Sequence, residues 1–364
     1  MNKIGLYIHV PFCASKCGYC DFYSRVRPDL IAPYIAALKE ELRRWEGRGL
    51  QADTLFFGGG TPSLLPPREV GALISLCRRI FSLGAEAEVT LEANPDTVSL
   101  ESLAGYRRAG VNRLSMGMQS AVAKELRLLA RSHSPEAVKL AVGAAREAGF
   151  DNLSLDLMLG LPRQTMDSLK YSLEAATALN PEHLSCYILK IEKNTAFNRR
   201  LMQRYCPSDD LTADFYLAVS HFLQEHGYAH YEISNFAQPG RESLHNLKYW
   251  RSEDYLGFGP AAHSCFAGQR FFHPADVVQY INTKGQDRIA DGPAGSAEER
   301  LMLALRLAEG VCPQNLPDSF DWADFISRCA PYEKGGLMAR TDAGGIRLTE
   351  RGFLLSNSIL ANLL

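Results

Sequence analysis

The chain has 364 residues, of which 46% are hydrophobic and 22% are charged, a composition typical of a globular protein and not of a disordered or fibrous one. Its 39 basic and 41 acidic side chains give a formal charge of −2, so we expect no nucleic-acid partner and no stable membrane insertion. The opening MNKIGLYIHVPFC is too short for a signal peptide or a membrane span, and an odd count of nine cysteines favours reduced thiols, so we expect a cytoplasmic protein.

Short apolar runs alternate with amphipathic stretches over the first half of the chain. Strands are predicted at residues 3–12, 53–59, 87–94, 112–119, 152–160 and 183–189, and helices at 31–45, 68–81, 100–110, 134–149 and 166–179. Strands that are apolar throughout and separated by helices need cover on both faces, which predicts a parallel sheet. Six such units predict an α/β fold, either a partial (β/α)6 barrel or a doubly wound sheet.

Glycine and polar residues gather where the predicted strands end. GGGTPS (58–63) follows the second strand, EANP (92–95) the third, GMQS (117–120) the fourth and DLMLGLP (156–162) the fifth. Both of the predicted folds bind ligands at the carboxyl ends of their parallel strands. We therefore expect these four segments to lie on one rim, together with the cysteine-containing loop that follows the first strand.

The alternation stops near residue 200. A predicted helix at 211–227 leads to a strand at 229–237, after which a section rich in glycine and aromatic residues continues to about residue 290. Helices at 298–310 and 322–330 precede IRLTERGFLLSNSILANLL, and together they predict a smaller, mainly helical, winged-helix-like end. The expected parts are a barrel at 1–230, a connecting segment at 231–295 and a C-terminal domain at 296–364.

Cys13, Cys17 and Cys20 stand in one short loop with the spacing CxxxCxxC. Three thiolates from one loop can bind three irons of a [4Fe-4S] cluster and leave the fourth iron open. The alternatives are a structural zinc site with His9 as fourth ligand, a thioredoxin-like redox pair in CGYC, and thiols without a ligand. The spacing favours the iron–sulfur cluster, because zinc sites usually combine paired CxxC or CxxC/HxxxH elements.

CxxxCxxC with an aromatic residue, Tyr19, just before the last cysteine, at the first strand end of a partial (β/α)6 barrel, resembles the radical S-adenosylmethionine (SAM) superfamily. The resemblance implies that Cys13, Cys17 and Cys20 hold a [4Fe-4S] cluster and that the amino and carboxylate groups of SAM chelate its open iron. It also implies an electron donor that reduces the cluster.

GGGTPS does not fit a phosphate loop, because it has no GK[ST], and it does not fit GxGxxG either. It could be a simple tight turn, or its glycines could let the backbone approach a ligand. The motif resembles the superfamily's glycine motif, which meets the SAM amino group. Similarity to the coproporphyrinogen oxidase branch implies SAM-binding roles for further residues. These are Tyr7, Gly59, Gly60, Thr61, Glu92, Gln119, Arg131 and Asp156.

His245, Asn246, Tyr249 and Trp250 form HNxxYW, which resembles the heme-binding motif of the HemW-type heme chaperones. Neutral histidine is a good axial ligand for heme iron, and aromatic neighbours suit a flat macrocycle. The alternative is a histidine that is hydrogen-bonded inside the protein and has only a structural role. The chain contains no CxxCH, so a thioether-linked heme is not indicated.

The resemblance spans nearly the whole chain and also distinguishes between two members of the branch. Oxygen-independent coproporphyrinogen III oxidases carry CxxxCxxCxC and an extension ahead of it, whereas this chain has Phe22 at the position of the extra cysteine and only twelve residues before Cys13. The expected function is therefore a heme chaperone that binds a [4Fe-4S] cluster, SAM and heme and delivers heme to acceptor hemoproteins. The alternatives are the oxidase itself, or a radical SAM enzyme with another substrate in which HNxxYW is structural.

Overall fold

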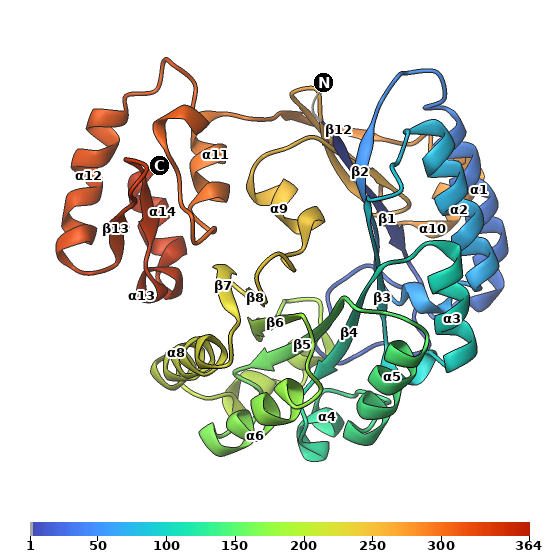
Figure 1. The fold of residues 1–364 in the computed structure, drawn as a ribbon, viewed down its shortest axis with the longest axis horizontal. Helices are drawn as coiled ribbons and strands as arrows, with labels where there is room; N and C mark the ends of the chain where they lie inside the picture. The colour runs from blue at the N-terminus through green and yellow to red at the C-terminus, as the bar shows by residue number, and fades with distance from the viewer. Residues whose placement is uncertain (1–2) are drawn as a thin grey trace.

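The predicted alternation of strands and helices is present in the computed structural model, which describes residues 3–364. The six predicted strands are β1 (Ile4–Val10), β2 (Ala52–Gly59), β3 (Glu88–Ala93), β4 (Arg113–Gln119), β5 (Leu153–Leu159) and β6 (His183–Ile188). Each pairs in parallel with the next along the chain, which confirms the predicted parallel sheet. The sheet curves strongly but stays open between its two edge strands, as a partial barrel does (Figure 1).

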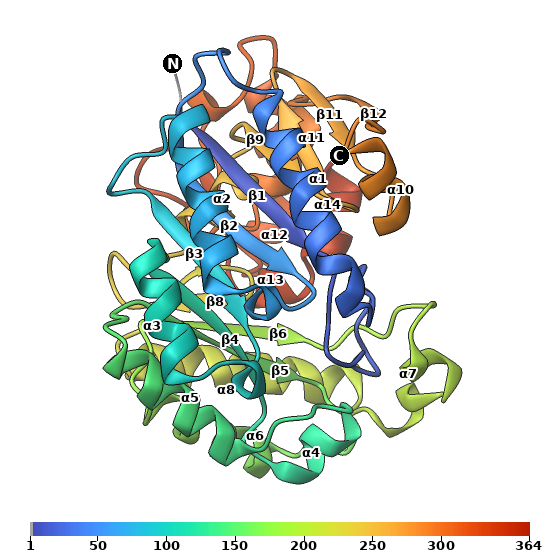
Figure 2. The same ribbon diagram turned by 90° about the vertical axis from the view of Figure 1, so that its right-hand side faces the viewer.

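Helices cover the outer, convex side of this sheet. The predicted ones are α1 (Ile31–Arg43), α2 (Pro67–Ile80), α3 (Leu100–Ala109), α5 (Pro135–Glu147), α6 (Met166–Thr177) and α8 (Asp209–Glu225). Figure 2 shows α1 and α2 lying across β1 and β2. Two short helices, α4 (Ala123–Leu128) and α7 (Ala196–Arg199), were not predicted. Short 3-10 helices lie at Pro28–Leu30, Pro62–Leu64, Pro95–Thr97, Met202–Tyr205 and Pro313–Asn315.

Local sequence signals explain where these helices start and end. Ser99 and Thr165 begin α3 and α6, and each side-chain oxygen accepts a hydrogen bond from the backbone N–H three residues later. Gly110 ends α3 with a φ of 106°, a conformation that glycine adopts without steric cost.

The segment 231–295, expected to be a connector, is part of the same sheet. It holds β8 (Asn235–Ala237), β9 (Tyr255–Phe258), β10 (His263–Phe266), β11 (Gln269–Phe272) and β12 (Ile289–Pro293), with β7 (Ala229–Glu232) just before it. β9 extends the sheet beyond β1, and β8 extends it beyond β6. Strands of three to five residues are too short for a period to be recognised, and the pairing of β9 with β1 joins opposite ends of the sequence.

Two helices of this segment frame the sheet. The HNxxYW motif forms α9 (Leu244–Trp250), which lies on the inner, concave side of the sheet and faces the C-terminal unit (Figure 1). α10 (Val277–Thr283) packs against α1 on the outer side. The motif is therefore positioned over the interior of the barrel.

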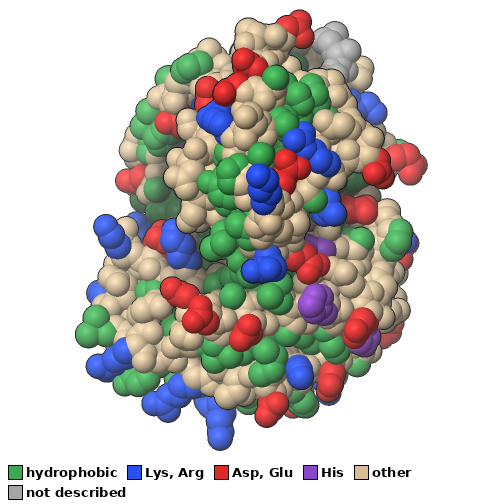
Figure 3. All heavy atoms as spheres, turned by 90° about the vertical axis from the view of Figure 1, so that its left-hand side faces the viewer, with side chains coloured by type: hydrophobic (Ala, Val, Ile, Leu, Met, Phe, Trp, Pro, Cys, Tyr) green, Lys and Arg blue, Asp and Glu red, His purple; other side chains and the backbone are tan. Residues whose placement is uncertain are grey.

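The C-terminal unit has the expected helical composition. It contains α11 (Ala297–Ala304), α12 (Trp322–Lys334), β13 (Met338–Arg340), β14 (Ile346–Leu348), α13 (Glu350–Leu354) and α14 (Ser356–Leu363). β13 and β14 form an antiparallel hairpin, the wing of a winged-helix-like unit. On the face that this unit presents, acidic and basic side chains are interspersed (Figure 3). Among the described residues, no helix is long and apolar enough to cross a membrane.

Candidate functional site

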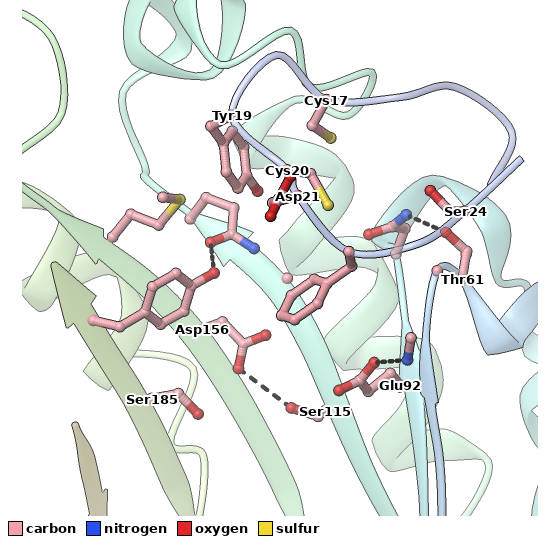
Figure 4. A pocket seen from close by; sticks show the side chains of 18 of the residues that line it. Cys17, Tyr19, Cys20, Asp21, Ser24, Thr61, Glu92, Ser115, Asp156 and Ser185 are labelled. Atoms are coloured by element: carbon pink, nitrogen blue, oxygen red, sulfur yellow. Dashed lines mark hydrogen bonds between the residues drawn. The ribbon is translucent and has the colours of Figure 1, made fainter. Parts of the chain in front are cut away.

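A cavity of about 630 Å³ occupies the inner side of the curved sheet and opens at the rim where the parallel strands end (Figure 4). Side chains alternate along a strand, so every second residue faces this interior. The strand residues that line the cavity are Phe56, Gly59, Glu92, Ala93, Arg113, Ser115, Gly117, Gln119, Asp156, Met158, His183, Ser185, Tyr187, Ile188 and Asn235. Most of them are polar, although a barrel interior without a ligand is usually filled by apolar side chains.

The three loop cysteines, Cys13, Cys17 and Cys20, all line the mouth of this cavity as free, partly exposed thiols. The loop is closed at its base by Arg25, whose N–H donates to Pro11 O at 2.8 Å and whose carbonyl accepts from Cys13 N at 3.1 Å. In Figure 4 the thiols of Cys17 and Cys20 project from the loop above Glu92 and Asp156. The structure thus brings together the three cysteines that the spacing grouped.

Donors approach two of these sulfur atoms. Thr61 Oγ1 donates to Cys13 Sγ at 3.5 Å, and Arg131 Nη1 lies 3.6 Å from Cys17 Sγ. Donors and positive charge stabilise thiolates, the form of cysteine that binds iron, whereas burial raises the pKa of the Cys20 thiol. Three thiols at one cavity mouth, with cationic support, fit a cluster that keeps one iron open.

The zinc alternative fits less well. His9 Nε2 donates to Tyr23 O at 2.9 Å, and its Nδ1 accepts from the Tyr7 hydroxyl at 3.0 Å. Both ring nitrogens are therefore occupied, and burial lowers the pKa of His9 to about 4.

The glycines of GGGTPS are required by close packing against the end of β1. A Cβ on Gly60 would lie 2.5 Å from Phe12 O, and Gly59 has a φ of 108° with the His9 ring 2.6 Å from its Cβ position. The backbone N–H groups of Gly60 and Thr61 donate to Val10 O and Phe12 O at 2.8 and 2.7 Å. This contact fixes the backbone directly before the first loop cysteine, Cys13.

Two carboxyl groups face the cavity, one from β3 and one from β5. Glu92 accepts a hydrogen bond from Gly59 N at 3.1 Å, and Asp156 accepts one from Ser115 Oγ at 3.2 Å (Figure 4). Burial and the nearby Asp156 raise the pKa of Glu92 to about 8, and burial raises the pKa of Asp156 to about 6. Carboxyl groups with raised pKa values in a cavity are typical of ligand-binding sites.

Gln119 and Arg131 reach the cavity from the end of β4 and the region after it. Gln119 has a φ of 67°, unusual for a residue other than glycine, at an irregularity of β4, and its Oε1 accepts from Tyr187 OH at 2.8 Å. Arg131 Nη2 donates to Asn94 Oδ1 at 2.7 Å and to Gly117 O at 3.0 Å. The guanidinium therefore bridges the cysteine loop and two strand ends.

The two predicted tyrosines occupy different places. Tyr19 lines the cavity and packs edge-on against Phe197, with a ring distance of 6.1 Å. Tyr7 does not line the cavity; it is half-buried in β1, and desolvation raises the pKa of its hydroxyl. Residues not predicted but present at the cavity include Asn94, Ser115, Arg113, Ser185 and Tyr187. For Asn94, Arg113 and Ser115 the available signal was their period-two spacing from Glu92 or Gln119, whereas β6 carries no predicted residue that could point to Ser185 and Tyr187.

The HNxxYW motif contributes Asn246, and not His245, to the cavity wall. His245 is 1% exposed, its Nδ1 is 2.8 Å from Thr54 Oγ1, and its Nε2 is 2.8 Å from Tyr249 OH. Burial and the charge of Lys248 lower the pKa of His245 to about 3, so the ring is neutral. Ligation of heme iron by His245 stays a prediction, and in this conformation it requires that one of these hydrogen bonds break.

A buried carboxylate holds the start of α9. Glu88 accepts hydrogen bonds from Leu244 N and His245 N, both at 3.0 Å, and so stabilises the positive end of the helix. The HNxxYW helix is thereby tied to β3 beneath the cavity.

Comparison with known proteins gives two family matches. Residues 7–176 match the model of the radical SAM superfamily, and residues 295–355 match the model of the HemN C-terminal domain. The heme chaperone HemW of Bacillus subtilis is 36% identical, with 97% of each chain covered. HemW of Escherichia coli is 35% identical over 99% of this chain and 98% of its own. Among solved structures, coproporphyrinogen III oxidase (HemN) from Escherichia coli, a radical SAM enzyme, is 27% identical, with a TM-score of 0.84 over 99% of this chain and 90% of that one.

Proposed function

Because the chain belongs to the HemW heme-chaperone family of radical SAM proteins, we propose that it binds heme and transfers it to acceptor hemoproteins. The observation that carries the proposal is the similarity to heme chaperones over 97% or more of both chains. The nine free cysteines favour a reducing compartment, so we place this activity in the cytoplasm.

The three loop cysteines would hold a [4Fe-4S] cluster at the cavity mouth. When bound, such a cluster supplies the electron for SAM cleavage in radical SAM proteins, and an electron donor must restore it. Arg131 and Thr61 would stabilise the negative charge of the thiolates through their contacts to Cys17 and Cys13.

SAM would lie across the strand ends beside the cluster cysteines. Gly59, Gly60 and Thr61 offer backbone groups to the amino acid end, while Glu92 and Asp156 offer acceptors for amino and hydroxyl groups. Gln119, Arg131 and Tyr19 complete the same rim. Tyr7 would act indirectly, by holding His9 beneath Gly59.

His245 is not accessible to heme in this conformation, because its ring is buried and hydrogen-bonded to Thr54 and Tyr249. The Tyr249 hydroxyl holds Nε2, the nitrogen that would face a ligand once α9 turns. Opening would expose a histidine that is already neutral and therefore able to bind iron.

Heme titration of matched variants tests this ligand. His245→Ala should weaken the Soret band typical of histidine-ligated heme, while Tyr249→Phe should free Nε2 and strengthen heme binding by roughly fivefold, the value of one hydrogen bond. The cluster absorbance should stay unchanged in both variants. A heme spectrum unaffected by either change would leave the chaperone function standing and move the ligand elsewhere.

Coproporphyrinogen III oxidation is the second candidate, favoured by the structural similarity to HemN at a TM-score of 0.84. Phe22 argues against it, because this residue stands where the oxidases have a further cysteine. Its side chain is 70% exposed at the cavity mouth, so it supplies an apolar surface there and no thiol.

A further inference from the structure

Arg113 lies at the inner end of the cavity, far from the cysteine loop. It is the first residue of β4 and is 2% exposed, and its side chain lines the cavity on the same face of the strand as Ser115, Gly117 and Gln119. Arg113 stands six positions before Gln119 on β4, which corresponds to at most roughly 20 Å because the strand is irregular near Gln119. A group bound at Arg113 would therefore lie deeper in the cavity than the cysteine loop, near Glu92 and Asp156, where burial raises the pKa values and the charge of Arg113 partly offsets that rise.

The buried guanidinium of Arg113 is incompletely paired in the described part of the chain. Its Nε has no hydrogen-bond partner, and although its charge partly offsets the rise in pKa that burial causes at Glu92 and Asp156, it forms no ion pair with either within residues 3–364. Arginine stays charged at all physiological pH values, and a buried charge without a partner strongly disfavours the folded state. Proteins keep such a group where a ligand supplies the opposite charge.

The nearby carboxyl groups are engaged elsewhere. Glu92 accepts from Gly59 N, Asp156 from Ser115 Oγ, and Glu88 from the first N–H groups of α9. Burial lowers the pKa values of His183 and His245 and keeps both histidines neutral, and the charge of Arg113 lowers these pKa values further. Arg113 therefore keeps hydrogen-bonding capacity that none of these carboxyl groups uses.

Further polar groups lie on the strand beside Arg113 or line the same cavity. Thr90, the register neighbour of Arg113 on β3, has a buried Oγ1 without a hydrogen bond, and so does Asn235 Oδ1 on β8. Asn246 of α9 lines the same cavity with an amide side chain that can donate. The cavity thus offers a guanidinium, which can bind a carboxylate through two parallel hydrogen bonds, and an amide that can donate a further one.

We infer that the inner end of the cavity is a carboxylate-binding subsite in which Arg113, assisted by Asn246, pairs with a carboxylate of the bound ligand. The inference rests on the proposed heme-carrier function, because the propionates of heme are the carboxylates that such a ligand presents. It adds a recognition residue, Arg113, that lies outside both the cysteine loop and HNxxYW. SAM also carries a carboxylate, so the experiment must separate the two sources.

Binding of heme and of heme dimethyl ester, whose propionates are esterified, is measured on the reconstituted protein. The parent should bind the ester more weakly than heme, by roughly 10- to 100-fold, as for a hydrogen-bonded charge pair. In Arg113→Gln this difference should vanish, because heme affinity falls to that of the ester. Arg113→Lys should restore part of it, and Arg68→Gln, at a side chain 89% exposed, should change nothing.

The same comparison is made with SAM and decarboxylated SAM. If Arg113→Gln removes only the difference in affinity between SAM and decarboxylated SAM, the carboxylate subsite stands and its ligand is SAM. If neither pair depends on Arg113 while the parent still binds heme, the subsite is wrong and the proposed function remains. A parent protein that binds no heme refutes the proposed function, and the subsite then rests on the SAM pair alone.

Stability provides an independent readout. Arg113→Met should raise the midpoint of thermal unfolding of the ligand-free protein, because it removes an unpaired buried charge, and should reduce the stabilisation caused by added ligand. A lowered midpoint with unchanged ligand affinity would show that Arg113 is a structural residue and overturn the inference.

Discussion

Replacing Gly60 by alanine tests how the glycine motif positions the cysteine loop. The new Cβ would lie 2.5 Å from Phe12 O and 2.9 Å from Val10 O, whereas carbon–oxygen contacts prefer about 3.3 Å or more. Both carbonyls are held by hydrogen bonds from Gly60 N and Thr61 N, so neither can move freely. Relief requires a shift of several tenths of an ångström at the residue that precedes Cys13.

The expected destabilisation combines two effects. Overpacking by one methyl group costs roughly 1–3 kcal/mol, and weakening one backbone hydrogen bond adds about 1 kcal/mol. We therefore expect the free energy of unfolding to fall by roughly 2–4 kcal/mol. Because the displaced carbonyl is adjacent to Cys13, the reconstituted protein should also retain less iron and sulfide.

Gly143→Ala is the matched control, since Gly143 lies in α5 with no atom within 4 Å of its Cβ position. This substitution should stabilise the protein by about 0.5–1 kcal/mol, because alanine favours a helix over glycine. Urea unfolding and iron analysis of both variants measure the two effects. Parent-like stability and iron content in Gly60→Ala would refute the packing argument.

Three further predictions concern the cavity. Alanine at any of the three loop cysteines should abolish the cluster absorbance, whereas the control variant Cys265→Ala should retain it. Bound zinc without sulfide in anaerobically purified protein would contradict the presence of an iron–sulfur cluster. Asp156→Ala should weaken SAM binding by roughly tenfold or more, measured by calorimetry, with iron content unchanged. The pKa of Glu92 is about 8 in the folded ligand-free chain, against an ordinary value of 4.5. Between these pH values the folded chain therefore holds a proton that the unfolded chain releases. The free energy of unfolding should consequently fall as pH rises from 4.5 to about 8. Glu92→Gln should remove that part of the fall in urea titrations at pH 6 and pH 8, and an identical pH slope in the variant would contradict the assignment.

The parallel sheet and its rim could be predicted because long apolar strands and amphipathic helices carry strong periodic signals. The common position of the cysteine loop and the four strand-end segments follows from the same periodicity, since residues that end parallel strands meet on one side of the sheet. The roles of Glu92 and Asp156 came only from the resemblance to the coproporphyrinogen oxidase branch. The helix predicted at 100–110 also ends where α3 does, at Gly110.

The extension of the sheet by β9 to β12 could not be predicted, because these strands are only four or five residues long and join the sheet through the pairing of β9 with β1, at the other end of the sequence. The strand predicted at 229–237 is divided into β7 and β8. The position of His245 was also out of reach. Its burial depends on Thr54 and Tyr249, and the contact to Thr54 joins residues 191 positions apart. Arg113 was missed for a similar reason, since a charged residue at the start of an apolar strand reads as a solvated strand end.

Transfer of heme from the loaded protein to a heme-free hemoprotein tests the central claim most directly. The protein is reconstituted with its cluster, loaded with heme, freed of excess heme and mixed with the acceptor, whose recovered absorbance and activity are followed. The chaperone account predicts stoichiometric restoration of the acceptor, with His245→Ala acting poorly and coproporphyrinogen III left unconverted in a parallel reaction with SAM. Sustained conversion of coproporphyrinogen III to protoporphyrinogen IX with consumption of SAM, and no transfer of heme, would contradict it.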